Sequence, residues 1–111
     1  MSKLIVTSFL LFTTLSAYPQ KVFSVDNKAF ADIIVVVVDN SAFADLLVFK
    51  VDNEAFVGNN DGKWFFVSNQ AFAKKKIYFT NNTAFADIKI FYVNNQSFAG
   101  WKNGKKKYLL E

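Results

Sequence analysis

The stretch VDNKAFAD, residues 25–32, recurs with substitutions five more times and sets the organisation of the chain. The later copies start at residues 38 (VDNSAFAD), 51 (VDNEAFVG), 67 (VSNQAFAK), 80 (TNNTAFAD) and 93 (VNNQSFAG). Their starts are separated by 13, 13, 16, 13 and 13 residues. Because self-similarity at a fixed period is the signature of a repeat architecture, we interpret the chain as six tandem units.

The one break in this period is itself repeated. Residues 58–63 (GNNDGK) follow the third unit and resemble residues 100–105 (GWKNGK), which follow the sixth unit 42 residues later. The chain is therefore two copies of a three-unit block.

The residues before each start are rich in Val, Ile, Phe and Tyr, which predicts a β-strand in every unit. Apolar residues stand three positions before each start: Val22, Val35, Val48, Trp64, Ile77 and Ile90. They also stand two positions before it: Phe23, Val36, Phe49, Phe65, Tyr78 and Phe91. A simple alternation of apolar and polar residues along the strand fails at this second set, so we expect a bulge or a strand covered on both faces. The repeat alone predicts an all-β solenoid or barrel.

Every unit carries Asn as its third residue: Asn27, Asn40, Asn53, Asn69, Asn82 and Asn95. This ladder predicts a turn, because Asn tolerates left-handed backbone angles and can bond its own main chain. Phe is the sixth residue of every unit: Phe30, Phe43, Phe56, Phe72, Phe85 and Phe98. We expect these rings to pack inside, the alternative being an aromatic platform for sugars or bases.

The length and composition limit the class of protein. A chain of 111 residues has room for one domain, and 52% hydrophobic with 20% charged residues indicates a folded, soluble body. Cys and His are absent, which excludes disulfides, thiolate or imidazole metal sites, and Cys or His nucleophiles. With no phosphate-binding glycine motif either, we expect no cofactor and no enzymatic activity.

Each of the six units has the same order, which is a strand, V-D-N, Ala-Asp and again a strand, and residues 99–102 (AGWK) close the last unit. In this order the chain resembles the septoil-knot domain family over residues 21–107. In that family the unit commonly reads V-D-Y-E-S-Q-A-D, whereas here Asn replaces Tyr and Phe replaces Gln. The resemblance implies an all-β, compact barrel-like body of six repeats of about 13 residues in two blocks of three, deeply knotted as a seven-crossing torus knot. It also implies a small, often exported bacterial protein of unknown function, and it brings no catalytic residues.

The first 17 residues predict a secretory signal peptide. A short cationic start containing Lys3 precedes the apolar residues 4–15, and Ala17 provides a small residue for cleavage. The alternative is that residues 4–15 form a first buried strand. We therefore expect residues 18–111 to be the mature, single repeat-built domain, either secreted or periplasmic.

Two sets of acidic residues recur with the units. The first set is Asp26, Asp39 and Asp52, whose carboxylates could form a ladder that binds calcium. The second block carries Ser68, Asn81 and Asn94 at the same position, so we favour a role in capping the turns. The second set is Asp32, Asp45 and Asp87, two of which could supply a carboxylate pair for hydrolysis. Because these residues recur from unit to unit, we favour a structural role. Asp61 lies in the insertion, where NNDG is also an ordinary turn.

Charge is unevenly distributed along the chain, since residues 1–61 carry four Lys and seven acids whereas residues 62–111 carry nine Lys and two acids. Two Lys runs and the Trp beside each insertion form our candidate binding set: Lys74, Lys75, Lys76, Lys102, Lys105, Lys106, Lys107, Trp64 and Trp101. Its partner would be an anionic polysaccharide or lipid surface. Lack of Arg argues against sequence-specific nucleic-acid recognition. The alternatives are a solubilising Lys face and Trp rings that only pack.

We interpret the protein as a non-enzymatic structural or interaction protein, secreted or periplasmic and monomeric. The alternative is an envelope-associated binding module that uses the Lys-rich face. A further hypothesis is an assembling, amyloid-like adhesin, because residues 33–38 (IIVVVV) are six uncharged β-branched residues in a row.

Overall fold

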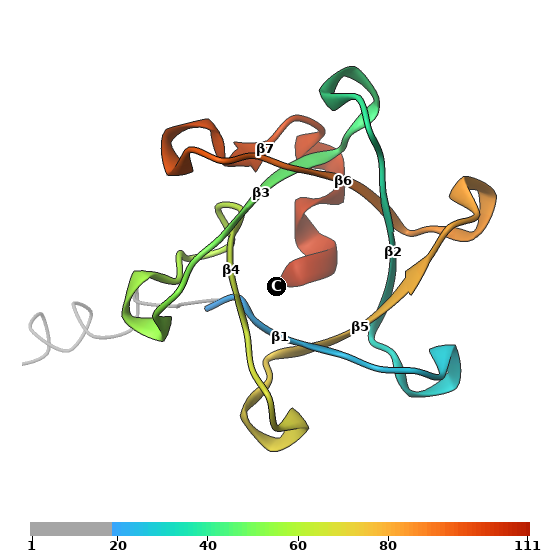
Figure 1. Ribbon diagram of the computed structural model, residues 1–111. Helices are drawn as coiled ribbons and strands as arrows, with labels where there is room; N and C mark the ends of the chain where they lie inside the picture. Colours follow the sequence, from blue (N-terminus) through green and yellow to red (C-terminus); the bar gives the residue numbers. More distant parts are fainter. Residues whose placement is uncertain (1–18) are drawn as a thin grey trace, which may run out of the picture.

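The computed structural model describes residues 19–111, so the predicted signal peptide, residues 1–17, lies outside the described residues. The strands are β1 (Lys21–Ser24), β2 (Ile33–Val37), β3 (Leu46–Lys50), β4 (Lys63–Phe66), β5 (Lys75–Thr80), β6 (Ile88–Tyr92) and β7 (Gly100–Trp101). The 3-10 helices are η2 (Lys28–Phe30), η3 (Ser41–Phe43), η4 (Glu54–Phe56), η5 (Gln70–Phe72), η6 (Thr83–Phe85), η7 (Gln96–Phe98) and η8 (Gly104–Leu110). Each repeat unit thus contributes one strand and one short outward turn (Figure 1).

Strands β1 to β6 close into a parallel barrel. Neighbours in the order β4-β1-β5-β2-β6-β3 are hydrogen bonded, and a pairing of β3 with β4 completes the ring. All six pairings in the ring are parallel. Closure gives each of these strands two neighbours, so the barrel prediction is confirmed and the solenoid alternative is wrong.

The two blocks alternate around the barrel. Each strand of the first block, β1 to β3, lies between two strands of the second block, β4 to β6. The chain therefore winds around the barrel twice, and its second passage fills the gaps left by the first (Figure 1). The apolar run at residues 33–38 falls mainly in β2, which pairs with both β5 and β6 and so offers no free edge for cross-β assembly.

Strand residues alternate between the barrel interior and its outer face. The residues three positions before each start are fully buried and form the centre of the core: Val22, Val35, Val48, Trp64, Ile77 and Ile90. The residues two positions before each start lie on the outer face, where Val36 is buried and the others are half-buried. The outer face of the strands is therefore only partly covered, and the expectation of a strand covered on both faces holds fully at Val36 alone among this set.

The C-terminal helix η8 closes one end of the barrel. Because the six strands are parallel, their first residues lie at the same end, which we call the amino end. Leu110 of η8 is fully buried in the core, and Figure 1 shows η8 within the ring. Three side-chain contacts fix η8 to the amino end: Gln20 Nε2 to Leu110 O, 3.0 Å; Asn60 Nδ2 to Lys107 O, 3.0 Å; and Lys106 Nζ to Asp45 Oδ2, 3.2 Å.

The insertion at residues 58–63 anchors this closure. Asn60 is buried, and both its carbonyl and its side-chain oxygen accept from Trp101 Nε1, at 3.2 and 3.1 Å. Gly62 has a φ of +90°, and a Cβ there would clash with the carbonyl oxygen of Leu47. Glycine is therefore required where the chain passes the junction of β3 and β7.

Candidate functional site

Each repeat unit ends in an outward turn that begins with a capping Asn. In all six units the Asn side-chain oxygen accepts a hydrogen bond from the backbone N–H two residues later, at 2.9–3.0 Å. The prediction that Asn bonds its own main chain is confirmed. Left-handed angles are not used, since the φ of these residues lies between −104° and −136°.

The Phe at the end of each turn is exposed to solvent, so the prediction that this set packs inside is wrong. The exposed fractions are 67% for Phe30, 65% for Phe43, 64% for Phe56, 69% for Phe72, 67% for Phe85 and 63% for Phe98. The strand residues already fill the barrel interior, and the 3-10 turn carries the sixth residue of each unit away from the barrel wall. We call this set of six residues, one from each turn around the barrel, the phenylalanine ring; the term means the circle of six residues and not the phenyl group of one side chain.

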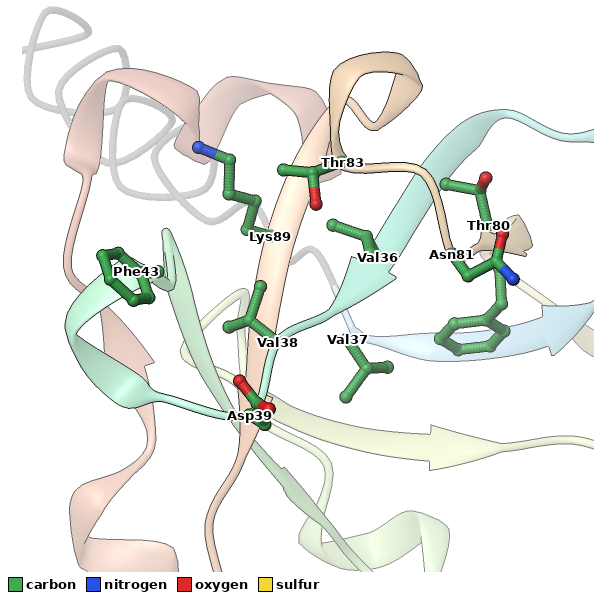
Figure 2. Close-up of a pocket in the computed structure, with 10 residues that line it drawn as sticks. Val36, Val37, Val38, Asp39, Phe43, Thr80, Asn81, Thr83 and Lys89 are labelled. Carbon is green, nitrogen blue, oxygen red and sulfur yellow. The ribbon is translucent and has the colours of Figure 1, made fainter.

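A groove with a volume of about 610 Å³ lies against Phe43. Figure 2 shows Phe43 and Asn81 on opposite sides of this groove, with Val36 and Val38 between them. Val36 and Val38 belong to the same unit as Phe43, whereas Asn81 and Thr83 come from the neighbouring turn. The groove therefore joins an aromatic and apolar wall to a polar rim.

Equivalent grooves lie against four other members of the phenylalanine ring. Those at Phe56, Phe72, Phe85 and Phe98 have volumes of about 370, 330, 330 and 410 Å³. Each also contains the outer-face strand residue of its own unit: Phe49, Phe65, Tyr78 or Phe91. All these volumes fall within the range of about 300–1,000 Å³ typical of small-molecule sites. One surface is thus presented repeatedly around the barrel.

The charged residues at the rims differ from groove to groove. Asp39 and Lys89 line the groove at Phe43, and Asp26 and Lys28 line the groove at Phe85. Lys21 and Glu54, at the Phe72 groove, form an ion pair of 2.8 Å. Asp52 is the one charged residue at the Phe56 groove, and the residues lining the Phe98 groove are uncharged. What the grooves share is an aromatic ring, an apolar floor and amide or hydroxyl groups.

The first acidic set does not cap the turns, because the neighbouring Asn residues perform that role. Asp26, Asp39 and Asp52 are exposed, and no hydrogen bond or ion pair joins their carboxylates to another residue of the described chain. Within residues 19–111, no group of three or more Asp, Glu, His or Cys side chains is placed to hold a metal ion.

The second acidic set has a structural role, as predicted. Each carboxylate accepts the backbone N–H of a residue in a neighbouring strand: Asp32 from Lys76 at 2.8 Å, Asp45 from Lys89 at 2.9 Å, and Asp87 from Ile34 at 2.8 Å. Asp61 accepts the backbone N–H of Lys63 at 3.3 Å within its own turn. The carboxylates of Asp32, Asp45 and Asp87 therefore join neighbouring units, whereas that of Asp61 stabilises its own turn.

Asp45 is the most connected of these acids. Its carboxylate also accepts from Lys106 Nζ at 3.2 Å and from Asn103 Nδ2 at 3.4 Å. Burial of the carboxyl group raises its pKa, but the hydrogen bonds from the Lys89 N–H, Lys106 and Asn103 outweigh this effect. The pKa of Asp45 is therefore lowered from its ordinary value of 3.8.

Both Lys runs lie at the amino end of the barrel. Lys74 donates its backbone N–H to the carbonyl of Lys21 at 2.6 Å, and the adjacent Gln20 bonds to η8. Lys74, Lys105 and Lys107 are exposed, whereas Lys75 and Lys76 are half-buried. Two members of the set make structural contacts: Lys102 Nζ with the carbonyl of Ser41 at 2.6 Å, and Lys106 Nζ with Asp45.

The two candidate Trp residues are parts of the structural framework. Trp64 is completely buried in the barrel, with its ring centroid 6.2 Å from that of Phe66, so the hypothesis of a ligand contact at Trp64 is wrong. Trp101 is half-buried against the core, and its Nε1 donates to Asn60. The insertions beside these residues take part in the C-terminal closure.

No helix within the described part of the chain is long and apolar enough to cross a membrane. Comparison with curated proteins and with solved structures gives no match. The sequence profile of one protein family, described as the 7(1) septoil knot domain, matches residues 19–102, and the doubly wound barrel is consistent with that description. The chain therefore belongs to the septoil knot domain family.

Proposed function

We propose that the protein is a non-enzymatic interaction protein that acts outside the cytoplasm and binds its partner through the phenylalanine ring. The observation that carries this proposal is the exposure of 63–69% at the same position of all six units. Exposed apolar side chains that lie together mark interaction sites in soluble proteins, and here each grooved Phe lies beside an apolar strand residue of its own unit. Full burial of one Phe side chain contributes about 1.5–3 kcal/mol, so several turns acting together give useful affinity.

Two features support the proposed location outside the cytoplasm and the proposed lack of enzymatic activity. The composition of residues 1–17 favours export to the periplasm or the extracellular space. The repeated carboxylates Asp32, Asp45 and Asp87 already accept backbone hydrogen bonds, which supports a role without catalysis.

A second candidate surface is the amino end of the barrel, because two separate Lys runs meet there. Lys74, Lys105 and Lys107 are exposed at that end and would attract an anionic polysaccharide or lipid headgroups. Binding of this kind weakens as salt screens the charges, whereas contacts through the phenylalanine ring do not. Salt dependence therefore separates the two surfaces.

Co-sedimentation of the purified protein with envelope fragments and extracellular polymer of its source organism tests the proposal. One variant replaces all six ring residues by Ser, and a second carries Lys74→Gln, Lys105→Gln and Lys107→Gln. Tyr108→Ser is the matched control, because Tyr108 is 66% exposed but lines none of the five grooves described above. We expect the six-Ser variant alone to stay in the supernatant at physiological salt. Full binding by that variant would overturn the proposal. Loss of binding by the Lys variant would favour the amino end of the barrel as the binding surface.

A further inference from the structure

The grooves beside the phenylalanine ring combine features that together point to one class of partner. This inference rests on the proposed function and names the partner of the same surface. We infer that each groove binds a sugar ring of a neutral polysaccharide, with several grooves engaged at once.

The wall of each groove suits the less polar face of a sugar ring. In the Phe43 groove the exposed ring of Phe43 stands beside the aliphatic side chains of Val36 and Val38. A pyranose presents several C–H groups on one face, and an aromatic ring is a flat apolar surface on which such a face can lie. Contact there removes apolar surface from water on both partners.

The rim of each groove suits the hydroxyl edge of a sugar ring. Asn81 and Thr83 border the Phe43 groove, Asn94 and Gln96 border the Phe56 groove, and Ser68 borders the Phe72 groove. An acyl chain or an apolar peptide side chain would cover these groups without bonding to them, which costs free energy. A sugar ring satisfies both the apolar wall and the polar rim.

The charges at the rims favour an uncharged polymer. Asp39 and Lys89 balance in one groove, Asp26 and Lys28 balance in another, and the groove at Phe98 is lined by uncharged residues. The ion pair of Lys21 with Glu54 neutralises a fourth groove, and Asp52 makes the fifth negative. None of the five grooves carries a net positive charge, so an anionic polymer would be disfavoured here.

The grooves also recur from unit to unit of the barrel. Equivalent grooves around a closed barrel match a partner that is itself a chain of equivalent units. Each shallow groove needs only weak affinity for one sugar ring, because linked sites raise overall affinity by a factor of about 10²–10⁴. A polysaccharide supplies such linked rings.

Depletion assays at 0.5 M NaCl test this inference with four probes: cellulose, chitin, a β-1,3-glucan and starch. We expect the protein to bind at least one of them, and the six-Ser variant to lose about 100-fold or more in affinity because avidity is lost. Single variants extend the test within one groove: Phe43→Ser, and Asn81→Ala with Thr83→Ala, should each weaken binding about 2- to 5-fold. An effect of the rim variant distinguishes sugar recognition from hydrophobic adhesion. Tyr108→Ser is the control, and thermal unfolding confirms that every variant is folded.

Two results would overturn the inference. One is failure to bind all four polysaccharides while envelope co-sedimentation still requires the phenylalanine ring, in which case the proposed function survives and the partner class is wrong. The other is binding to neutral phosphatidylcholine vesicles that depends on the ring but not on Asn81 and Thr83, which would indicate membrane adhesion. If envelope co-sedimentation is also independent of the ring, both proposals fail.

Discussion

The barrel interior and the outward turns carry the same class of residue with opposite exposure. Trp64 and Phe72 belong to the same repeat unit, yet Trp64 is 0% exposed and Phe72 is 69% exposed. Trp64 lies on the inner face of β4, where the closed barrel surrounds it, whereas Phe72 ends a 3-10 turn that begins at the Asn69 cap. Position within the unit, and not hydrophobicity, therefore decides which aromatic rings form the core.

The largest difference between the two regions should appear on truncation of these two rings. Trp64→Ala removes a buried ring and leaves a cavity, so we expect a loss of about 3–5 kcal/mol in unfolding free energy. Phe72→Ala should change it by less than about 0.5 kcal/mol, because that ring is mostly in water. Equilibrium denaturant unfolding measures both values. Equal losses would show that the turns share the packing of the core.

The second-largest loss of stability is expected in the carboxylate network at the amino end of the barrel. Asp45→Asn removes a buried charge that accepts three hydrogen bonds, and we expect a loss of about 1.5–3 kcal/mol at neutral pH. Because the folded-state pKa of Asp45 is lowered, its contribution is present above pH 3.8 and is lost as the pH falls through the folded pKa. Asp45→Asn should therefore flatten the acid limb of the stability profile. Asp39→Asn, at an exposed position, is the control for the loss at neutral pH and should change the unfolding free energy by less than about 0.5 kcal/mol.

Removal of one turn cap should have a smaller effect. Asn40→Ala deletes the acceptor for the Ala42 N–H, which costs about 0.5–2 kcal/mol in comparable helix caps. The neighbouring Asp39→Ala, which removes no hydrogen bond to a described residue, should stay within about 0.5 kcal/mol. Thermal unfolding of the two variants compares them directly. A larger loss for Asp39→Ala would contradict the assignment of the cap to Asn.

The smallest effect should be a gain. Lys74 occupies the position at which three other units carry Asp32, Asp45 and Asp87, and its backbone N–H bonds to Lys21 O as theirs do to their own partners. Lys74→Asp would supply the missing carboxylate to the Lys21 N–H, and we expect about 0.5–1.5 kcal/mol of stabilisation. Lys74→Asn, which provides a neutral acceptor, should gain less. Destabilisation by Lys74→Asp would show that this junction differs from the other three.

Repetition was sufficient to predict the units, their two blocks and the structural role of the second acidic set, because equivalent positions of different units have equivalent environments. It left solenoid and barrel open, and the family resemblance favoured the barrel. The exposure of the phenylalanine ring could not be predicted in this way, since several apolar positions per unit compete for one interior. A usable signal was present, however: a capping Asn three positions before each Phe places that Phe inside a turn and outside the strand.

The C-terminal closure was the other feature that repetition concealed. Asn103 accepts the N–H of Lys105 at 3.2 Å, so η8 begins with the same cap as the outward turns. Its later residues are apolar, and Leu110 enters the barrel instead of remaining in solvent. The burial of Trp64 was concealed in the same way, because the insertion beside it serves this closure.

The alternating order of the two blocks also determines when the barrel can form during synthesis. Val22 pairs with Lys75, and Leu46 pairs with Ile90, so the strands of the first block meet their neighbours only after most of the chain has left the ribosome. Half of the protein therefore has no stable fold of its own. Each block supplies all the barrel neighbours of the other block's strands, so the two blocks are parts of a single folding unit.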